Sequence, residues 1–214
     1  MLSKSFTDIR TWVFDLDNTL YPPDMALFDQ IEIKMADWVM NAIGVTRPIA
    51  DQLRKEYWQR YGTTLAGLMA EHCVDPWSFL DAVHDIDMSH ITQDPVLADG
   101  ITSLPGRKIV YTNGSAPYAR RVLKARGLDT VFDAVYGIEH AQFKPKPDTA
   151  AFEAIFKTDG IDPRAAAMFE DDARNLKAPF AMGMRTIHVS PQAAPAAHIQ
   201  HHTSDLAQFL LQLA

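Results

Sequence analysis

Two aspartates separated by one residue follow a short apolar stretch near the start of the chain. The stretch 12–14 suits a buried strand, and Asp15 and Asp17 come directly after it. Because open parallel sheets hold their ligands at the carboxyl ends of the strands, we expect both carboxylates to face one crevice. Such a pair supplies one group to attack an electrophile and one to move a proton. The alternative is an Asx-turn, since Asp and Asn are common turn residues.

A second polar group, Thr112 to Ser115, follows the predicted strand 107–111 and leads into a predicted helix. The Thr112 hydroxyl, the Asn113 amide and the backbone N–H groups beyond them suit an anion, because the helix dipole favours negative charge there. The alternative is that the segment is simply a polar helix cap.

Two lysines, Lys144 and Lys146, precede a predicted helix that begins at Pro147. A positive charge at the N-terminus of a helix opposes the helix dipole, so a lysine there makes more sense if it faces an anion. We expect one of the two lysines to face an anion and the other to be solvated.

Three adjacent acids, Glu170, Asp171 and Asp172, follow the predicted strand 166–169. Near Asp15 these carboxylates would raise one another's pKa unless a cation neutralised them. Oxygen-only ligands suit a hard ion, and Mg²⁺ needs only one or two carboxylates together with a substrate phosphate. The alternative is a helix start that favours acids, which explains Asp172 well and Glu170 poorly.

These polar groups are positioned by strands that alternate with helices in the second half of the chain. Strands are predicted at 10–14, 107–111, 134–136, 166–169 and 186–189, and helices at 116–126, 147–157, 174–182 and 204–213. This alternation predicts an α/β fold, a Rossmann-like parallel sheet with helices on both faces.

Between the first and second strands the pattern is helical only. Apolar residues at spacings of three and four predict helices at 27–42, 46–61, 65–72 and 75–83. Gly44 and Gly62 are placed to end the first two. We therefore predict an α/β core domain of residues 1–21 and 96–214 and an all-helical cap domain of residues 22–95, inserted after the first strand.

The composition bounds the class of protein. The chain has 214 residues, 47% hydrophobic and 22% charged, which is ordinary for a globular protein with a large core. A formal charge of −7 argues against a nucleic-acid polymer as partner. The single Cys73 and the lack of a run long enough for a signal peptide or a membrane span predict a cytoplasmic location without membrane contact. We expect His198, His201 and His202 to be solvated.

The four polar motifs, in their order along the chain, resemble those of the haloacid dehalogenase-like hydrolase superfamily. The similarity covers nearly the whole chain. The matching positions are Asp15-Leu16-Asp17-Asn18-Thr19, Thr112, Lys144 or Lys146, and Glu170-Asp171. The helical insertion resembles the cap of the subfamily whose cap follows the first motif. The stretch from Asp15 to Tyr21 is similar to the branch of pyrimidine 5'-nucleotidases.

The resemblance implies a Mg²⁺-dependent hydrolase that cleaves phosphate monoesters through a phospho-aspartyl intermediate. It implies that Asp15 is the nucleophile and Asp17 the general acid and base. Lys146 is implied as a third catalytic residue, which also binds the substrate together with Thr112 and Asn113. The implied metal ligands are Asp15, Asp17, Glu170 and Asp171.

Two motif positions differ in how they match the family pattern. Lys146 is preferred to Lys144 because the family pattern has a bulky residue six positions after the lysine, where Phe152 stands. Glu170 is a departure, since the family often has Gly or Asp there.

The resemblance also implies a small phosphorylated metabolite as substrate, in particular a pyrimidine nucleoside 5'-monophosphate. Four aromatics of the predicted cap are candidates to stack on a base, although aromatics at helical spacing are more often core residues: Trp38, Tyr57, Trp58 and Tyr61. A phosphomutase of the same fold and a non-catalytic binding protein are the alternatives. A dehalogenase is disfavoured, because that branch resembles a single-aspartate motif and this chain has Asp17.

Overall fold

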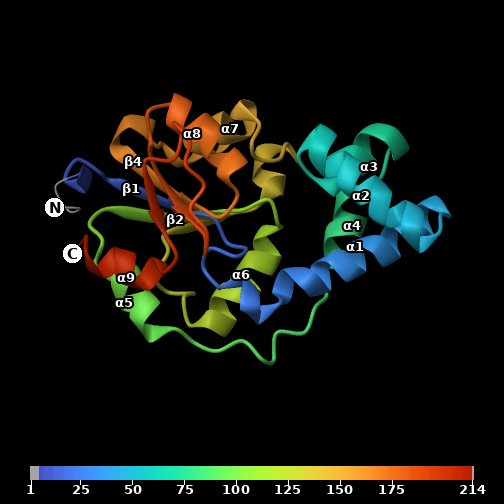
Figure 1. Ribbon diagram of the computed structural model, residues 1–214, viewed down its shortest axis with the longest axis horizontal. Helices are drawn as coiled ribbons and strands as arrows, with labels where there is room; N and C mark the ends of the chain where they lie inside the picture. Colours follow the sequence, from blue (N-terminus) through green and yellow to red (C-terminus); the bar gives the residue numbers. More distant parts are fainter. Residues whose placement is uncertain (1–4, 214) are drawn as a thin grey trace.

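The computed structural model describes residues 5–213, and its centre is a sheet of six parallel strands (Figure 1). The strands are β1 (Thr11–Phe14), β2 (Arg107–Tyr111), β3 (Ala134–Tyr136), β4 (Ala166–Glu170), β5 (Arg185–Val189) and β6 (His201–Thr203). Their order across the sheet is β3-β2-β1-β4-β5-β6, and every neighbouring pair is parallel. The carboxyl ends of β1, β2 and β4 therefore meet at one edge.

The strands carry apolar side chains on both faces, as expected where helices cover both sides of a parallel sheet. Along β1, Trp12 and Phe14 belong to one buried cluster and Val13 to another. Along β4, Phe169 joins the first cluster and Met168 the second. Because successive side chains of a strand point to opposite faces, these short runs contribute to two cores at once.

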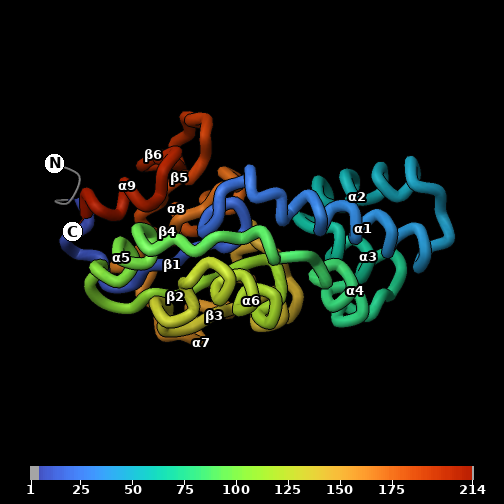
Figure 2. Tube along the Cα trace, turned by 90° about the horizontal axis from the view of Figure 1, so that it is seen from below, coloured from blue at the N-terminus to red at the C-terminus, as the bar shows by residue number. Residues whose placement is uncertain are grey.

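The helices of the core cover the two faces separately (Figures 1 and 2). They are α5 (Pro95–Ser103), α6 (Ala116–Arg126), α7 (Thr149–Asp159), α8 (Lys177–Ala181) and α9 (Leu206–Leu211). Leu97 of α5, Tyr118 of α6 and Phe209 of α9 pack in the first cluster, whereas Phe152 of α7 and Ala178 of α8 pack in the second. The predicted α/β class is thus confirmed.

Four helices follow β1 in the chain and lie together beside one end of the sheet (Figure 2). They are α1 (Leu27–Ile43), α2 (Arg47–Tyr61), α3 (Thr64–His72) and α4 (Pro76–Val83). The close contact of α2 with α3 depends on Gly67, because a Cβ there would lie 2.2 Å from Tyr57 Cγ. The segment is helical as the sequence predicts, and its limits at residues 22 and 95 stay a prediction.

The structure adds one helix and one strand, and it shortens two predicted helices, of which 204–213 is observed as Leu206–Leu211. Neither α5 nor β6 was predicted as a separate element. The expected helix 174–182 is a 3₁₀ turn, Ala173–Leu176, followed by the five-residue α8. A continuous helix is disfavoured there because Pro179 has no N–H to donate to Asn175 O. Among residues 5–213, no helix has both the length and the apolar character that a membrane crossing requires.

The histidines near the C-terminus differ from the expectation. β6 pairs with β5 and returns this segment to the sheet. The ring of His201 lies 5.0 Å from that of Phe6, and His198 is also half-buried. The prediction of solvated side chains is therefore wrong for these two residues, of which the edge strand packs His201 onto Phe6 and Phe209, and it is confirmed for the exposed His202.

Candidate active site

A buried lysine lies between two carboxylates where β1 and β4 end. Lys146 Nζ donates to Asp15 Oδ1 at 2.6 Å, to Glu170 Oε2 at 2.6 Å and to Tyr111 O at 3.1 Å. Lys146 and Glu170 are each 1% exposed and Asp15 is 5% exposed. Lys144 is exposed. The structure therefore brings Lys146, and not Lys144, into contact with the acidic groups.

The backbone of Lys146 is held by the predicted anion-binding segment after β2. Asn113 Oδ1 accepts from Lys146 N at 2.8 Å, and Asn113 Nδ2 donates to Lys146 O at 3.2 Å. The Asn113 amide, which we expected to bind substrate, thus bonds to the lysine loop in this structure. The insertion also contacts this loop, because a Cβ on Gly62 would lie 3.3 Å from Lys146 O.

Thr112 is fully buried and borders the same space. Its Oγ1 accepts a hydrogen bond from Gly114 N at 2.9 Å. Among residues 5–213 no acceptor is found for the hydroxyl hydrogen, so the hydroxyl is available to donate to an anion.

Three carboxylates form a group that suits a cation. Asp15, Glu170 and Asp171 each offer an oxygen, and these oxygens lie within 4.8 Å of one another. Burial, followed by the charges of Glu170 and Asp15, raises the pKa of Asp171 to about 9. Burial and Glu170 also raise the pKa of Asp15 well above its usual range, against the opposing effect of Lys146. A hard cation would relieve this crowding, and the all-oxygen donor set fits Mg²⁺.

The two acids that follow β4 have different partners. Glu170 Oε2 accepts from Lys146, and Glu170 Oε1 accepts from Asp172 N and Asn175 Nδ2, each at 3.2 Å. Asp171 Oδ2 accepts a long contact of 3.4 Å from Asn18 Nδ2, and the Asp171 carboxyl also interacts with that of Glu170, but no lysine or backbone N–H of the described residues donates to it. Among the described residues, Asp171 is therefore the freer of the two to bind a metal ion.

Asp17, the second aspartate of the first motif, has its own pair of donors. The hydroxyls of Tyr21 and Tyr118 donate to Asp17 Oδ1 at 2.6 and 2.7 Å. Burial raises the pKa of Asp17, and the two phenol hydrogen bonds lower it. Neither tyrosine was among the site residues predicted from the sequence. Tyr21 is close to the motif, but nothing local indicates Tyr118, which is 101 residues away.

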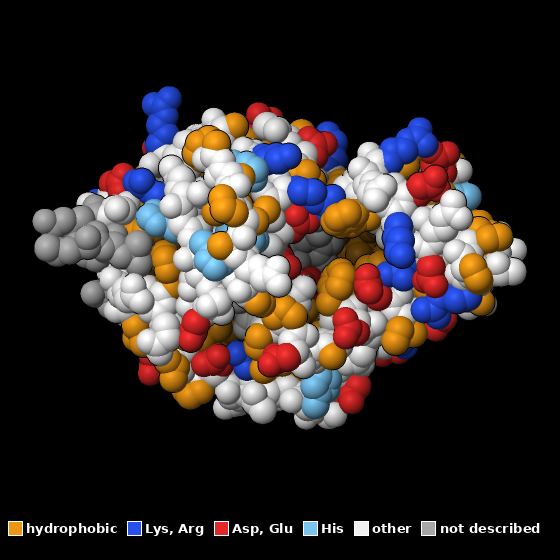
Figure 3. Space-filling model, viewed as in Figure 1, with side chains coloured by type: hydrophobic (Ala, Val, Ile, Leu, Met, Phe, Trp, Pro, Cys, Tyr) orange, Lys and Arg blue, Asp and Glu red, His pale blue; other side chains and the backbone are white. Residues whose placement is uncertain are grey.

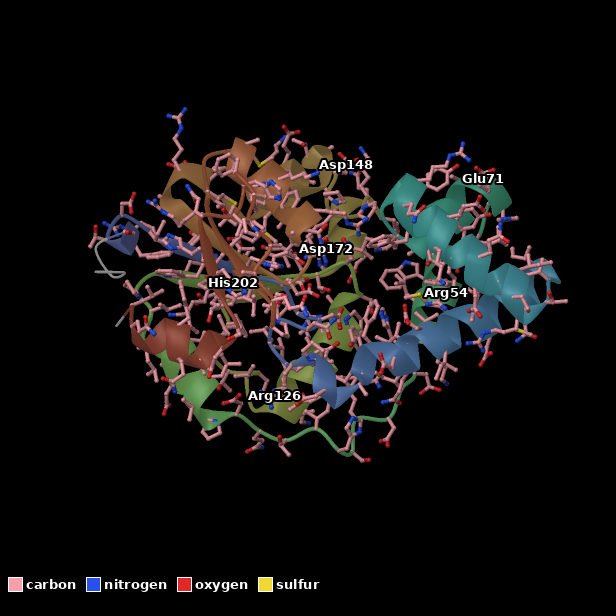
Figure 4. The ribbon with its side chains drawn as sticks, in the orientation of Figure 1. Arg54, Glu71, Arg126, Asp148, Asp172 and His202 are labelled. Atoms are coloured by element: carbon pink, nitrogen blue, oxygen red, sulfur yellow. The ribbon has the colours of Figure 1, made fainter. Side chains whose placement is uncertain are left out.

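The carboxylates, Thr112, Asn113 and Lys146, but not the two tyrosines, line a cavity of about 1210 Å³ between the strand ends and the insertion. Figure 3 shows it as a hollow between the two parts of the molecule, and Figure 4 places Asp172 on the core side and Arg54 on the insertion side. The lining on the insertion side combines apolar, aromatic and charged side chains: Phe28, Ile31, Arg54, Lys55, Trp58 and Phe79.

One of the four candidate stacking aromatics, Trp58, lines this cavity. It is 46% exposed, and the Arg174 guanidinium lies over its ring at 3.4 Å from the centroid. Arg174 is itself paired with Asp172 at 2.6 Å. The other three aromatics pack within the insertion: Trp38 on Phe79, Tyr57 with His72, and Tyr61 with Glu71. These three aromatics therefore pack against other residues of the insertion and do not line the cavity, where a substrate base would stack.

A parallel sheet holds its ligands at the carboxyl ends of its strands, and here a lysine and several carboxylates gather at that edge. The family model of haloacid dehalogenase-like hydrolases matches residues 9–183, so the chain belongs to that family.

Comparison with known proteins agrees with this assignment. Phosphate metabolism protein 8 of Saccharomyces cerevisiae is 25% identical over an alignment of 198 residues, which covers 84% of this chain and 61% of that protein. The chain thus spans less than two thirds of this relative's length.

Solved structures of three other proteins share the fold. YfnB from Bacillus subtilis, solved with bound magnesium, has a TM-score of 0.62 at 15% identity and covers 96% of this chain and 98% of its own. A protein from Thermotoga maritima described as a β-phosphoglucomutase has the same TM-score, identity and coverage of this chain. A 2-haloacid dehalogenase from Pseudomonas syringae has a TM-score of 0.58 at 21% identity, covering 96% and 100%. Since different chemistries use this fold, the site has to indicate the activity.

Proposed function

We propose that the protein is a Mg²⁺-dependent phosphatase that hydrolyses small phosphate monoesters through a phospho-aspartyl intermediate. The main support is Asp17, a second carboxylate beside Asp15 that borders the same cavity. Phosphoester cleavage needs both a nucleophile and a proton donor for the leaving alcohol. A dehalogenase has no such leaving alcohol to protonate, and its motif resembles a single aspartate.

In the first step, an oxygen of Asp15 attacks phosphorus and the bond to the ester oxygen breaks. The proton of Asp17 passes to that oxygen, and the alcohol leaves. In the second step, a water oxygen attacks the phosphorus of the phospho-aspartyl group and transfers a proton to Asp17. Inorganic phosphate leaves, and the Asp15 carboxylate and the Asp17 acid are restored.

Lys146 and Thr112 have the charge and the hydrogen-bond donors to hold the transferring phosphoryl group. The ammonium of Lys146 lies 2.6 Å from Asp15 Oδ1, so it adjoins the atom at which the new bond forms. The Thr112 hydroxyl borders the same cavity. Preorganised donors of this kind usually contribute a large part of the catalysis of phosphoryl transfer.

Mg²⁺, when bound, would reduce the repulsion between the anionic nucleophile and the anionic substrate. Asp15 and Asp171 are the side chains best placed to hold it, together with the Asp17 backbone carbonyl. Glu170 is within the same group but bonds to Lys146, so we assign it the secondary role of fixing the lysine.

We further propose that helices α1–α4 act as a cap that selects a small substrate, with a pyrimidine nucleoside 5'-monophosphate as the first candidate. Trp58 gives the cavity an aromatic wall. A phosphomutase is the second candidate, because a protein described as a β-phosphoglucomutase shares the fold.

The test is a panel of phosphate esters assayed for released phosphate with Mg²⁺: UMP, CMP, AMP, phosphoglycolate and glucose phosphates. We expect hydrolysis of at least one nucleotide and its loss in Asp15→Asn, which removes the nucleophile without changing volume. Normal turnover in Asp15→Asn would contradict the mechanism. Isomerised sugar phosphate that forms only with a sugar bisphosphate present would identify the mutase instead.

A further inference from the structure

Asp17 is held by two phenols that come from different parts of the fold. Tyr21 belongs to the loop after β1 and Tyr118 to the first turns of α6. Both hydroxyls donate to the same atom, Asp17 Oδ1, at 2.6 and 2.7 Å, and both side chains are 1% exposed. Among residues 5–213 no hydrogen bond to Asp17 Oδ2 is found. Asp17 Oδ1 thus accepts two hydrogen bonds, whereas Oδ2 is available to give and take the proton.

We propose that Tyr21 and Tyr118 are positioning residues that orient Asp17 for its two proton transfers, an inference that rests on the phosphatase function proposed above. A carboxylate held at one oxygen by two donors from separate elements cannot turn about its Cβ–Cγ bond without losing at least one of them. When Asp17 is ionised, between the two transfers, these short hydrogen bonds are among the stronger ones in proteins. The pair therefore restricts the orientation of the carboxyl group, and we assign the proton transfers to Oδ2, since Asp17 borders the cavity.

Tyr118 is in turn supported by the insertion. The ring of His84, the residue after α4, stacks on the ring of Tyr118 at 4.2 Å between centroids with 7° between the planes. His84 Nδ1 and Ser115 Oγ lie 3.1 Å apart in a hydrogen bond. His84, at the end of α4, thus holds Tyr118 in place, and Tyr118 in turn holds Asp17. Tyr118 therefore has little freedom to follow the Asp17 carboxylate if that group rotates.

The proposal predicts a dependence on the leaving group. In the first step, the Asp17 proton moves to the ester oxygen as the bond between phosphorus and that oxygen breaks. An alkoxide needs this proton, whereas p-nitrophenolate is a stable anion that leaves without it. A poorly oriented acid should therefore slow alkyl esters far more than p-nitrophenyl phosphate.

The experiment compares kcat/KM of Tyr21→Phe and Tyr118→Phe for p-nitrophenyl phosphate and for an alkyl ester, glycerol 3-phosphate or the best nucleotide of the panel. This ratio reports the steps up to release of the alcohol and is independent of the later hydrolysis of the phospho-enzyme. We expect losses of about 10-fold to 100-fold for the alkyl ester, as for a weakened general acid, and much smaller losses for p-nitrophenyl phosphate.

Tyr136→Phe is the matched control, because it removes a phenol whose hydroxyl donates to Asp159 Oδ1 at 2.7 Å, away from the cavity lining. It should leave both rates unchanged. Equal losses for the two leaving groups, or no loss for either, would overturn the positioning role.

A crystal structure of the Tyr21→Phe/Tyr118→Phe double variant supplies a readout that does not depend on activity. We expect the Asp17 carboxylate in a new or a mixed orientation, and an unchanged single orientation would overturn the proposal. Failure of the phosphatase function itself is recognised separately, as wild-type protein that releases no phosphate from any ester.

Discussion

The Lys146 ammonium lies 2.6 Å from Asp15 Oδ1 and at the same distance from Glu170 Oε2, so a single buried cation offsets two buried carboxylates. Each of the three buried charges is stabilised by the opposite charge beside it. Removing one partner of a buried ion pair leaves an uncompensated charge, which costs far more than the loss of an exposed pair.

We therefore expect Lys146→Ala to lower kcat by about 10² to 10³, the usual effect of losing a donor to the developing charge. It should also lower the free energy of unfolding by about 3 to 5 kcal/mol without Mg²⁺, because Asp15 and Glu170 then repel each other unopposed. Steady-state kinetics and urea titration measure the two effects. Lys144→Ala is the matched control, since Lys144 is exposed and should tolerate the change. Similar small effects of both variants would show that Lys146 does not act in the site.

The second prediction concerns the metal. Chelation with EDTA should abolish activity and added Mg²⁺ restore it, whereas Ca²⁺, with its larger and looser coordination shell, should support activity poorly. Full turnover in metal-free buffer would refute the Mg²⁺ requirement.

The two acids after β4 should differ in this assay. Asp171→Ala should raise the Mg²⁺ concentration needed for half-maximal activity more than Glu170→Ala does, because the Glu170 oxygens already bond to Lys146, Asp172 N and Asn175. Isothermal titration with Mg²⁺ gives the same comparison without substrate. An Asp171→Ala variant that binds Mg²⁺ normally would remove Asp171 from the ligand set.

The third prediction concerns the contact between Trp58 of the insertion and Arg174 of the core. A cation–π contact at a partly exposed site contributes about 1 kcal/mol, here to holding the insertion against the core. Closure of the insertion over a bound substrate would lose this contribution in Trp58→Ala, so KM should rise about fivefold, with a smaller effect on kcat. Trp58→Phe keeps an aromatic face and should retain most of the affinity. Trp77→Ala is the control, because Trp77 contacts Phe143 of the core edge-to-face but does not line the cavity. An unchanged KM in Trp58→Ala would mean that the contact does not influence substrate binding.

The fourth prediction concerns pH. Burial, with a smaller contribution from Arg121, lowers the pKa of His84 to about 3. The unfolded chain therefore binds a proton at His84 that the folded chain does not, at pH values between about 6.5 and 3. The contribution of His84 to the free energy of unfolding is fully present above pH 6.5. It falls as the pH drops below that value, by up to about 1.4 kcal/mol per pH unit.

Urea unfolding of wild type and His84→Phe between pH 7.5 and 4 tests this. The phenyl ring preserves an aromatic partner for Tyr118 and cannot titrate, so the variant should lose less stability on acidification than wild type. His202→Gln, at an exposed position, should keep the wild-type slope. Parallel pH profiles for wild type and His84→Phe would disprove the assignment.

The amino-acid sequence by itself was sufficient to predict the α/β class and the helical insertion, since both depend on local periodicity. It also located Asp15, Asp17, Thr112, Glu170 and Asp171 at one edge of the sheet. Each of these residues lies within three residues of the end of a predicted apolar strand, and parallel strands bring their carboxyl ends together whatever their order. A pattern confined to a few neighbouring residues was enough for these predictions.

Only the tertiary structure decided which groups touch. The local surroundings of Lys144 and Lys146 are similar and only the family pattern favoured Lys146, whereas the structure shows directly that the loop turns Lys146 toward Asp15. It directs the Asn113 amide to the backbone of Lys146, and it brings Tyr118 to Asp17 across 101 residues of sequence. Such contacts depend on how whole elements pack, and the periodicity of a single segment carries no information about a partner on another element. The same reason explains β6, whose short polar sequence becomes a strand only because β5 offers it an open edge.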